Sequence, residues 1–271
     1  MWIYYLLTAV GGLSLLILLA IMPGKKRNTS PFDRTTYAHR GLHTNDGRVP
    51  ENSLAAFQAA VQAGYGVELD VQLTADRQIV VFHDNDLKRM CGIDKRVDEL
   101  TYSELSELRL LDSDQTIPLL SDVLEILDGA TLLCEFKALR SYTDTSLCQE
   151  ALPLLDAYKG EVCIESFNPF MVRWFRKNAP EYIRGILSKK FEKGEVAQAL
   201  RFPLASLFCN CLCRPDFIAY QHTDYKQFFF RLCKWLSPMT IAWTVRSPAE
   251  ETAAKRHFDA VIFEGYLPTT K

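Results

Sequence analysis

The sequence predicts an α/β protein whose main part is a closed (β/α)₈ barrel with a small insertion, preceded by one N-terminal transmembrane helix. Short apolar runs bounded by turn residues alternate with longer runs of helical period, a pattern typical of a mostly parallel sheet. Eight such runs fall within about 250 residues, which matches the strand count and the length of a closed barrel. The first 24 residues stand apart because they contain no charged residue.

The first element expected is a helix that crosses a membrane. Residues 1–22 are almost wholly apolar and, as a helix, would span ~33 Å, enough for the hydrocarbon layer of a bilayer. Aromatic residues near its start suit one membrane interface. Pro23 and Gly24 are expected to end the helix.

The flank of this helix predicts its orientation. The basic residues Lys25–Arg27 favour the cytoplasmic side of a membrane. The alternative is a cleaved signal peptide, but the segment has no basic start, is long for such a peptide, and lacks a small-residue cleavage site. We therefore predict a transmembrane anchor over 1–24, a juxtamembrane linker over 25–35 and a cytoplasmic barrel over 36–271.

The eight barrel strands are expected in the order in which the apolar runs occur. They are Tyr37–His39, Val67–Leu73, Thr131–Phe136, Glu161–Phe167, Ile183–Leu187, Phe217–Tyr220, Thr240–Val245 and Ala260–Glu264. Helices are predicted between most of them. Leu54–Ala63 follows the capping residues Asn52 and Ser53 and is ended by Gly64, and a later helix covers Pro248–His257.

One apolar run does not fit the alternation of strand and helix. Ile79–Phe82 follows the second strand after only five residues, which is too short for a parallel crossover, so we expect a hairpin arm. A turn over Ala75–Gln78 would place His83 opposite Asp70. The chain then needs an inserted subdomain over about 84–120, with helices near 101–108 and 120–127, before it returns to the barrel.

The overall charge argues against a nucleic-acid-binding protein, and the cysteine pattern argues against disulfide bonds and a cysteine metal site. With 31 Lys and Arg against 33 Asp and Glu, the chain lacks the broad positive field of a protein that grips nucleic-acid phosphates. In a cytoplasmic barrel the eight cysteines are expected to be reduced thiols. The run Phe208–Cys213 is interpreted as strand or loop packing, because no histidine or fourth cysteine lies at the spacing of a metal site.

Carboxylates converge at the predicted strand ends. Glu68 and Asp70 are two residues apart on a strand, so they point to the same face, and Glu135 and Lys137 repeat this spacing on the next barrel strand. Burying like charges together is costly unless a cation joins them, and hard oxygen ligands prefer Mg²⁺ or Ca²⁺. A buried Glu–Lys salt bridge is the alternative. Three carboxylates on adjacent strand ends favour the metal site.

Two of the five histidines lie at predicted strand ends near these carboxylates. His39 and His83 are suited to act as base and acid, while His43, His222 and His257 are expected to be structural. Arg40 offers a planar fork to an oxyanion and Lys137 a point charge to a phosphate. Together with a divalent ion, these groups indicate an anionic phosphoester as the substrate.

The arrangement of these motifs resembles the glycerophosphodiester phosphodiesterase family. The resemblance extends over most of residues 37–264 and rests on motifs in the family's order, namely His39-Arg40-Gly41, Pro50-Glu51-Asn52-Ser53, Glu68-Leu69-Asp70-Val71, Thr74-x-Asp76, His83-Asp84, Glu135-Phe136-Lys137, Ser166-Phe167 and Trp243-Thr244-Val245. It implies a metal-dependent TIM barrel with a small insertion.

The resemblance also implies roles for individual residues. Metal ligands are Glu68, Asp70 and Glu135, the acid/base pair is His39 and His83, phosphate binders are Arg40 and Lys137 with Glu51 nearby, and Trp243 packs against the glycerol or lipid part. The sequence departs from the family at the last strand, where Glu264 stands in place of the Asp of a Thr-Asp-x-Pro motif.

These expectations give one main function and two alternatives. The main one is metal-dependent hydrolysis of glycerophosphodiesters to sn-glycerol 3-phosphate and an alcohol. The alternatives are lysophospholipase D-type hydrolysis of lysophospholipids at the membrane, and an inactive membrane-bound scaffold. The aromatic residues Phe228–Phe230 and Trp235 are expected in the core of the sixth helix, with an apolar rim near the barrel mouth as the alternative.

Overall fold

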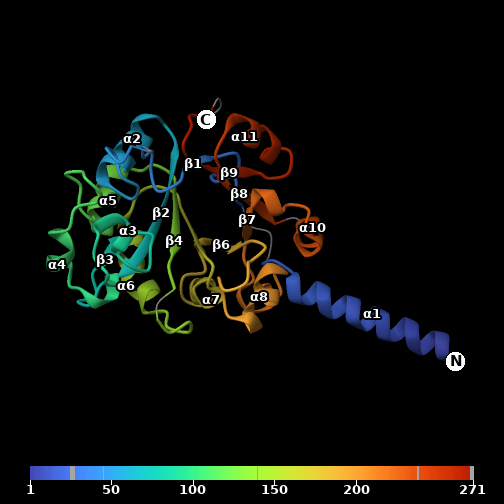
Figure 1. Ribbon diagram of the computed structural model, residues 1–271. Helices are drawn as coiled ribbons and strands as arrows, with labels where there is room; N and C mark the ends of the chain where they lie inside the picture. Colours follow the sequence, from blue (N-terminus) through green and yellow to red (C-terminus); the bar gives the residue numbers. More distant parts are fainter. Residues whose placement is uncertain (25–27, 45, 139, 237, 269–271) are drawn as a thin grey trace.

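A twisted sheet that closes on itself dominates the computed structural model (Figure 1). The structure describes residues 1–24, 28–44, 46–138, 140–236 and 238–268. Within these ranges nine strands follow the order β1-β9-β8-β7-β6-β5-β4-β2-β3, and an additional pairing of β1 with β2 closes the ring. Every pair is parallel except β2 with β3. The predicted (β/α)₈ barrel is confirmed.

The strands begin and end within about two residues of the predicted bounds. They are β1 Thr36–Ala38, β2 Gly66–Leu73, β3 Ile79–Val81, β4 Leu132–Phe136, β5 Val162–Ser166, β6 Ile183–Ser188, β7 Phe217–Gln221, β8 Met239–Val245 and β9 Ala260–Phe263.

The described residues form eleven α-helices, most of which cover the outside of the barrel. They are α1 Trp2–Ile21, α2 Leu54–Gln62, α3 Lys88–Cys91, α4 Tyr102–Ser106, α5 Leu120–Leu127, α6 Ser146–Ala157, α7 Pro169–Asn178, α8 Gln198–Ala205, α9 Asn210–Cys213, α10 Phe228–Trp235 and α11 Pro248–Ala254, with 3₁₀ turns η1 Val97–Glu99 and η2 His222–Asp224. Capping follows the sequence: Ser53 accepts from the N–H of Ala56 at the start of α2, and Gly64 has φ +76° just past its end.

The barrel is filled with side chains at the end opposite the predicted catalytic residues. A buried cluster inside the strands includes Leu133, Cys163, Phe217 and Ile241. Two further clusters join the outer faces of the strands to the surrounding helices. Because both faces are covered, β2 is buried along its whole length, including its polar residues Glu68, Asp70 and Gln72.

The predicted hairpin register is wrong by one residue. β2 and β3 pair as Val71 with Val81 and Leu73 with Ile79, so Asp70 lies opposite Phe82 and not opposite His83. The reason is a three-residue loop, in which the N–H of Thr74 donates to the carbonyl of Gln78 (3.0 Å). Arg77 adopts a left-handed conformation with φ +63°, which closes such a loop one residue earlier than the four-residue turn.

A small core of its own lies under the segment between β3 and α5. Phe82, Leu87, Met90, Leu105 and Ile117 are buried there together, beneath α3, η1 and α4. An isolated antiparallel bridge between Val80 and Leu119 ties the end of the segment back to β3. The segment therefore packs beside the barrel and holds the residues that follow β3 close to the strand ends.

Two interpretations of the C-terminal half need correction. Residues 209–213 do not pack as strand or loop, because Asn210–Cys213 forms the short helix α9. The alternating cysteines suggest a strand, but Cys209 and Cys213 are buried one helical turn apart whereas Cys211 is exposed. The aromatic residues of α10 are not all in the core: Phe230 is buried, while Phe228 is 68% exposed and Trp235 is 74% exposed.

The N-terminal helix α1 projects away from the barrel (Figure 1). In the part of the chain that the structure describes, it is the one helix long and apolar enough to cross a membrane, and its apolar window is not buried against the protein. The basic cluster Lys25–Arg27, on which the predicted orientation depends, lies outside the described residues.

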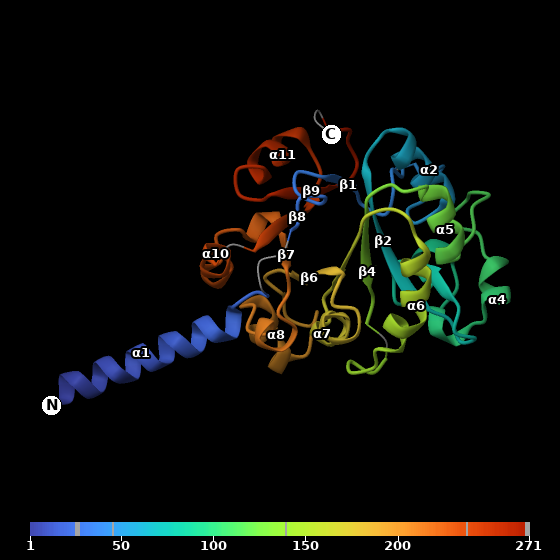
Figure 2. The same ribbon diagram turned by 180° about the vertical axis from the view of Figure 1, so that it is seen from behind.

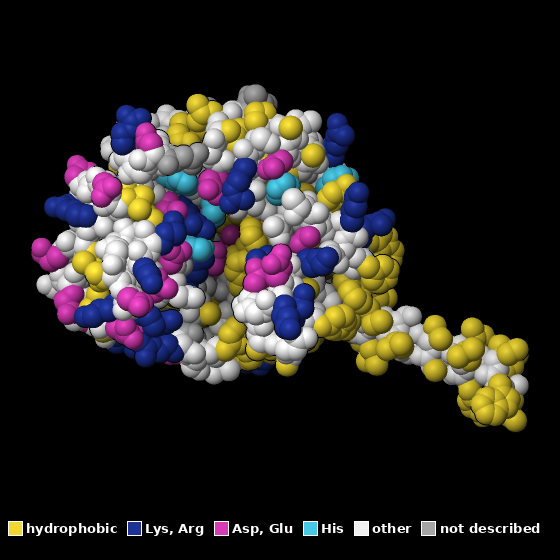
Figure 3. All heavy atoms as spheres, viewed as in Figure 1, with side chains coloured by type: hydrophobic (Ala, Val, Ile, Leu, Met, Phe, Trp, Pro, Cys, Tyr) yellow, Lys and Arg dark blue, Asp and Glu magenta, His cyan; other side chains and the backbone are white. Residues whose placement is uncertain are grey.

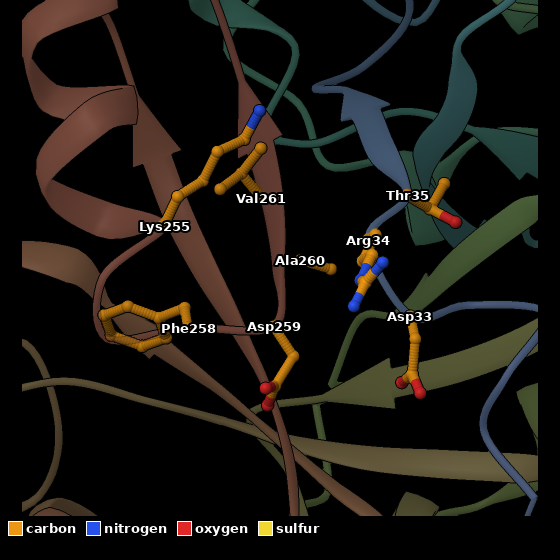
Figure 4. Close-up of a pocket in the computed structure, with 8 residues that line it drawn as sticks. All are labelled: Asp33, Arg34, Thr35, Lys255, Phe258, Asp259, Ala260 and Val261. Atoms are coloured by element: carbon orange, nitrogen blue, oxygen red, sulfur yellow. The ribbon is translucent and has the colours of Figure 1, made fainter. Parts of the chain in front are cut away.

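A pocket of about 590 Å³ lies at the N-terminal ends of β1 and β9. Figure 4 shows Asp33 and Arg34 on one side of it and Lys255 and Phe258 on the other. Since catalytic groups of such barrels lie at the C-terminal strand ends, this pocket is at the wrong end for the predicted chemistry.

The contact between β6 and β7 leaves no room for a side chain at Gly185, which gives a testable prediction. A Cβ on Gly185 would lie 2.1 Å from the ring of the buried Phe217, directly opposite it. We expect Gly185→Ala to lower the free energy of unfolding by about 1–3 kcal/mol through overpacking, measured by urea denaturation. Combining it with Phe217→Leu should cost less than the sum of the single changes. Strict additivity would show that the ring does not limit the site.

Candidate active site

Three carboxylates meet at the C-terminal ends of neighbouring strands. Glu68 and Asp70 lie on β2, and the parallel register pairs Asp70 with Glu135 on β4. All three are buried, and one oxygen atom from each lies within 4.8 Å of the others. The structure therefore brings together the three acids that the sequence predicted as metal ligands.

Two cations compensate part of this negative charge. The Nζ of Lys137 lies 2.7 Å from Asp70 Oδ1 and 2.7 Å from Glu135 Oε1. The guanidinium of Arg40 lies 3.5 Å from Asp70 Oδ2, and its backbone N–H donates to Glu68 Oε2 (2.9 Å). The salt bridge that the sequence offered as an alternative to a metal site is thus present within the same cluster.

The loop after β1 positions Arg40 by its backbone conformation. Arg40 and Gly41 both have positive φ, +55° and +80°. A Cβ on Gly41 would lie 2.8 Å from the backbone of Ala56, so the start of α2 packs directly on the loop. Asn52, from the same loop, donates through Nδ2 to Asp70 Oδ2 (2.8 Å). The His-Arg-Gly motif therefore turns the chain so that its own N–H and a neighbouring amide face the carboxylates.

Sequence reasoning missed a fourth buried carboxylate. Glu165 on β5 pairs in register with Glu135, is 1% exposed, and has no hydrogen-bond partner for Oε2 among the described residues. Its position next to Ser166 and Phe167, at the level of Glu135, was the available signal. Burial and the charges of Glu68 and Glu135 raise the pKa of Glu165 well above its ordinary value.

The pKa values of the four acids diverge. Burial raises the pKa of Asp70, but the charges of Lys137, His83 and Arg40 outweigh it and hold that pKa well below the ordinary range. Burial and the neighbouring acids raise the pKa of Glu68 well above its ordinary value, and the pKa of Glu135 is also raised despite Lys137. Lys137 and Arg40 are thus too few to neutralise four carboxylates, so the protonated form of some of these acids is favoured.

The cluster fits a divalent cation. Its donor atoms are carboxylate oxygens gathered within the distance that one ion bridges, and a doubly positive charge would offset the two acids that Lys137 and Arg40 leave unmatched. Oxygen-only donors favour Mg²⁺ or Ca²⁺ over softer metals. Glu68, Asp70 and Glu135 are the residues that would hold the ion.

His39 is held by a carboxylate that the sequence singled out as a departure from the family pattern. Its Nδ1 lies 2.8 Å from Glu264 Oε2, and Arg246 pairs with the same oxygen at 3.1 Å. Burial lowers the pKa of His39 to about 4, while the hydrogen bond with His39 lowers the pKa of Glu264 to about 2. At neutral pH the imidazole is therefore neutral and donates from Nδ1, which leaves Nε2 as an acceptor.

His83 has a matching partner on the other side of the cluster. Its Nδ1 lies 2.7 Å from Asp84 Oδ1, and Arg89 Nε donates to Asp84 Oδ2 (2.6 Å). Burial acts to raise the pKa of Asp84, but the hydrogen bonds from His83 and Arg89 lower it well below the ordinary range. The register error in the hairpin does not separate His83 from the acids, because His83 directly follows Phe82, whose N–H donates to the carbonyl of Asp70 (2.9 Å).

Glu51 links the two halves of the site. It accepts from Arg40 Nη1 at 2.7 Å and from Arg89 Nη2 at 2.6 Å. Burial acts to raise the pKa of Glu51, but hydrogen bonds from Arg89 and the charge of Arg40 outweigh it and lower that pKa. The insertion, which carries Arg89 in α3, is thereby connected to the loop after β1.

Aromatic side chains pack together at the C-terminal ends of β5, β6 and β8. Trp243 on β8 packs edge-on against Phe167 (5.5 Å between ring centres), and Phe167 packs against Phe191. The Nε1 of Trp243 is buried and has no hydrogen-bond partner among the described residues. Figure 3 shows histidine and charged side chains gathered around a hollow on this face of the molecule.

The remaining histidines differ in their distance from this region. His257 stacks on Tyr225 (4.2 Å between ring centres) and precedes the N-terminal end of β9, opposite the end of the barrel where the acids lie. His222 lies 3.5 Å from Glu250. Burial lowers the pKa of His43, which is half-buried and within electrostatic reach of Glu264 and Glu51, so this residue lies nearer to the site than its sequence context indicated.

Known proteins similar to this chain agree with the fold. Residues 39–264 match the model of the Glycerophosphoryl diester phosphodiesterase family. The chain is 34% identical over 163 residues to a glycerophosphodiester phosphodiesterase of Caldanaerobacter subterraneus subsp. tengcongensis, covering 55% of this chain and 65% of that protein. It is 35% identical over 150 residues to human Lysophospholipase D GDPD1, covering 49% of this chain and 47% of that protein. The matches thus span about half to nearly two thirds of these relatives.

Solved structures show the same barrel. A phosphodiesterase of Oleispira antarctica, determined in complex with the product sn-glycerol-3-phosphate, superposes with a TM-score of 0.70 at 22% identity, covering 86% of this chain and 94% of that one. A glycerophosphodiester phosphodiesterase of Parabacteroides distasonis superposes with a TM-score of 0.66 at 25% identity, covering 85% of this chain and 93% of that one.

The carboxylate cluster predicts that a divalent cation stabilises the folded chain. At a concentration of Mg²⁺ or Ca²⁺ about 100 times its dissociation constant, we expect a gain of about 2.7 kcal/mol, seen as a higher Tm in a thermal melt. The variant with Glu68→Gln, Asp70→Asn and Glu135→Gln should show no such gain. The exposed Asp112→Asn serves as the control. An equal gain in the triple variant would contradict a site at these residues.

Proposed function

The chain belongs to the glycerophosphoryl diester phosphodiesterase family, and from this premise we propose that it hydrolyses glycerophosphodiesters to sn-glycerol 3-phosphate and an alcohol, with Mg²⁺ or Ca²⁺ as cofactor. The observation that carries the proposal is the convergence of buried acids, two cations and two carboxylate-held histidines at the C-terminal strand ends. This set of groups suits the hydrolysis of a phosphodiester. The reaction needs positive charge to neutralise the phosphate, a base to remove one proton and an acid to supply another.

Binding of the phosphate falls to Arg40 and Lys137 in this proposal. Both are cations at the rim of the acid cluster, and the pKa of Lys137 is raised by Asp70 and Glu135 although burial acts against it, so it stays charged. A cation held by Glu68, Asp70 and Glu135 would supply Lewis acidity and offset charge on the phosphate. Glu51, paired with Arg40, would keep that guanidinium aimed at the substrate.

The histidines would move the protons. His39, neutral and donating from Nδ1 to Glu264, presents Nε2 to take a proton from the attacking oxygen, which is that of a water or of the glycerol 2-hydroxyl. His83, held by Asp84, would donate a proton to the departing alcohol oxygen. The new P–O bond forms as the P–O bond to the alcohol breaks, so one proton is taken and one is given. Attack by water gives sn-glycerol 3-phosphate directly. Attack by the 2-hydroxyl gives a cyclic phosphate, which a water then opens to the same product with the two proton roles exchanged. Trp243 would pack against the glycerol or lipid part.

Hydrolysis of lysophospholipids at a membrane is the second candidate. Two observations favour it: α1 is long and apolar enough to span a bilayer, and one relative carries the name Lysophospholipase D. In this proposal α1 is a single-pass anchor and the barrel is cytoplasmic, with the orientation resting on the basic residues Lys25–Arg27 of the sequence. The substrate class would then include lipids with one acyl chain as well as soluble diesters.

The proposed acid/base pair is tested by removing each imidazole. We expect His39→Ala and His83→Ala to lower kcat on glycerophosphocholine by about 10²–10⁴-fold each, because general acid–base catalysis contributes that much. Circular dichroism and Tm should stay close to those of the wild type. His257→Ala, at the opposite end of the barrel from the acids, is the control and should keep full turnover. Wild-type rates in both active-site variants would refute the assignment, and wild-type inactivity with intact binding would favour a scaffold.

The two substrate classes are separated by a direct comparison. Full-length protein in vesicles is expected to hydrolyse soluble glycerophosphocholine, and also lysophosphatidylcholine carried by the same vesicles, since both present the same glycerophosphodiester to the site. Released choline measures both reactions. Turnover of the soluble diester alone would remove the lysophospholipid candidate and leave the first proposal intact.

A further inference from the structure

Exposed aromatic rings gather on one side of the barrel, across α8 and α10. Phe208 lies within ring-contact distance of Phe202 (5.4 Å) and Phe229 (5.1 Å), and Phe229 also contacts Phe228 (5.2 Å). Phe202 and Phe228 are 58% and 68% exposed. Trp235, at the end of α10, is 74% exposed. We call Phe202, Phe208, Phe228, Phe229 and Trp235 the aromatic surface, and its exposed rings form a patch of the kind that marks an interaction site.

The root of α1 is fixed beside this surface. Asn210 Nδ2 in α9 and Cys233 Sγ in α10 donate to the carbonyl of Ile21 (2.8 and 3.3 Å), and Ile21 itself is fully buried. Arg214 Nη1 donates to the carbonyls of Leu19 and Met22 (2.8 Å each). The barrel thus supplies donors to the last carbonyls of α1, which would otherwise lack partners.

This junction sets which side of the barrel faces a membrane. Figures 1 and 2 both show α1 leaving the barrel next to α8 and α10, on the side away from α3 and α4. In Figure 3 hydrophobic side chains continue from α1 onto the adjoining part of the barrel. If α1 spans a bilayer, α9 and α10, which contact α1, and the adjoining α8 lie near the bilayer surface. Aromatic side chains prefer that interfacial depth.

A basic pocket adjoins the aromatic surface. Its volume is about 470 Å³, and it is lined by Tyr225, Lys226, Phe230, Arg231, Lys234 and His257. Three of these described residues carry a positive charge and none is acidic. Lys226 lies 5.5 Å from the centre of the Tyr225 ring, and Lys234 donates to the carbonyl of His257. Arg231, from the same helix as Phe228 and Trp235, adds a fork that suits a phosphate.

We propose that α8 and α10 form a docking face for an anionic phospholipid bilayer. The aromatic surface inserts at the interface, and the basic pocket receives a lipid phosphate. The inference rests on the proposed membrane anchor and goes beyond it, because the junction with α1 sets which side faces the bilayer but supplies no contact between the barrel and lipid. Docking through this face holds the barrel against the same bilayer that α1 crosses. Apolar area combined with nearby positive charge is the pattern of proteins that bind anionic membrane surfaces.

The first experiment measures whether the side chain of Trp235 lies within the bilayer. Full-length protein is placed in vesicles of phosphatidylcholine with phosphatidylserine, whose acyl chains carry bromine, a contact quencher of tryptophan. We expect the wild type to lose more fluorescence than Trp235→Phe, the difference being the signal of Trp235 in the bilayer. Equal quenching, with Trp235 open to acrylamide from water, would overturn the proposal.

The second experiment measures function on the surface and in solution. In the variant with Phe202→Ser, Phe228→Ser and Trp235→Ser, turnover of vesicle-borne lysophosphatidylcholine should fall about 10-fold, since apolar area at the interface is lost. Turnover of soluble glycerophosphocholine should not change. Leu111→Ser, an exposed apolar residue of the insertion, is the matched control and should leave both rates unchanged. Wild-type turnover of the lysolipid by the triple variant would contradict docking.

The third experiment tests the charge. Lys226→Gln with Arg231→Gln should abolish the increase in Trp235 quenching that phosphatidylserine produces, while the exposed Arg48→Gln should not. If sedimentation instead shows that the aromatic surface pairs two copies, and the triple variant is monomeric, a second copy is the occupant and the lipid proposal is wrong. Fluorescence quenching does not depend on catalysis. An inactive wild type would therefore contradict the proposed hydrolase function but not the proposed docking face.

Discussion

Four acids buried within one end of a barrel impose the constraint on which the rest of the site depends. Asp70, Glu135 and Glu165 are in register on adjacent parallel strands, and Glu68 lies two residues before Asp70 on β2. Among the described residues, the cations Lys137 and Arg40 lie 2.7 Å and 3.5 Å from oxygen atoms of Asp70. Charge of one sign cannot be left unmatched away from water without a large cost. The acids therefore take up protons or hold a cation, and the second outcome is the one that gives the cluster a chemical use.

The surrounding fold is arranged around that cluster. The loop after β1 adopts positive φ so that an N–H, a guanidinium and the amide of Asn52 face the acids. On either side a histidine is fixed through Nδ1 by a carboxylate that an arginine also holds, His39 with Glu264 and His83 with Asp84. In both rings the carboxylate thus engages Nδ1 and not Nε2, as the proposed proton transfers require.

The sequence alone was sufficient where a residue pattern has one structural solution. A continuous apolar run such as Ala260–Phe263 fits a strand buried on both faces. The parallel register of β2 and β4 then brings Glu68, Asp70 and Glu135 together. It failed where a single residue decides the outcome. Arg77 shortens the hairpin loop and shifts the register, and the alternating cysteines of α9 fit a strand as well as a helix. Glu165 was missed although it adjoins the Ser166-Phe167 motif, because a single carboxylate in an apolar run has no spacing that marks it.

Other features could be seen only in the folded chain. Residues 228, 229 and 230 are all phenylalanine, yet Phe230 is buried and Phe228 is largely exposed. The reason is that only one side of α10 packs against the barrel. The same holds for the junction of α1, where Asn210 and Arg214, nearly 200 residues away in the sequence, supply its last hydrogen bonds. Contacts between residues so far apart in the sequence produce no local periodicity. The sequence therefore identified α1 as an apolar helix but could not predict where it joins the barrel.

The ion that the acid cluster calls for can be located directly. Mn²⁺ shares the preference of Mg²⁺ and Ca²⁺ for oxygen ligands and scatters anomalously, so diffraction from a crystal soaked in Mn²⁺ marks its position. The account predicts one strong anomalous peak in contact with carboxylate oxygens of Glu68, Asp70 and Glu135. A map with no peak there, in which Lys137 alone bridges Asp70 and Glu135, would contradict it.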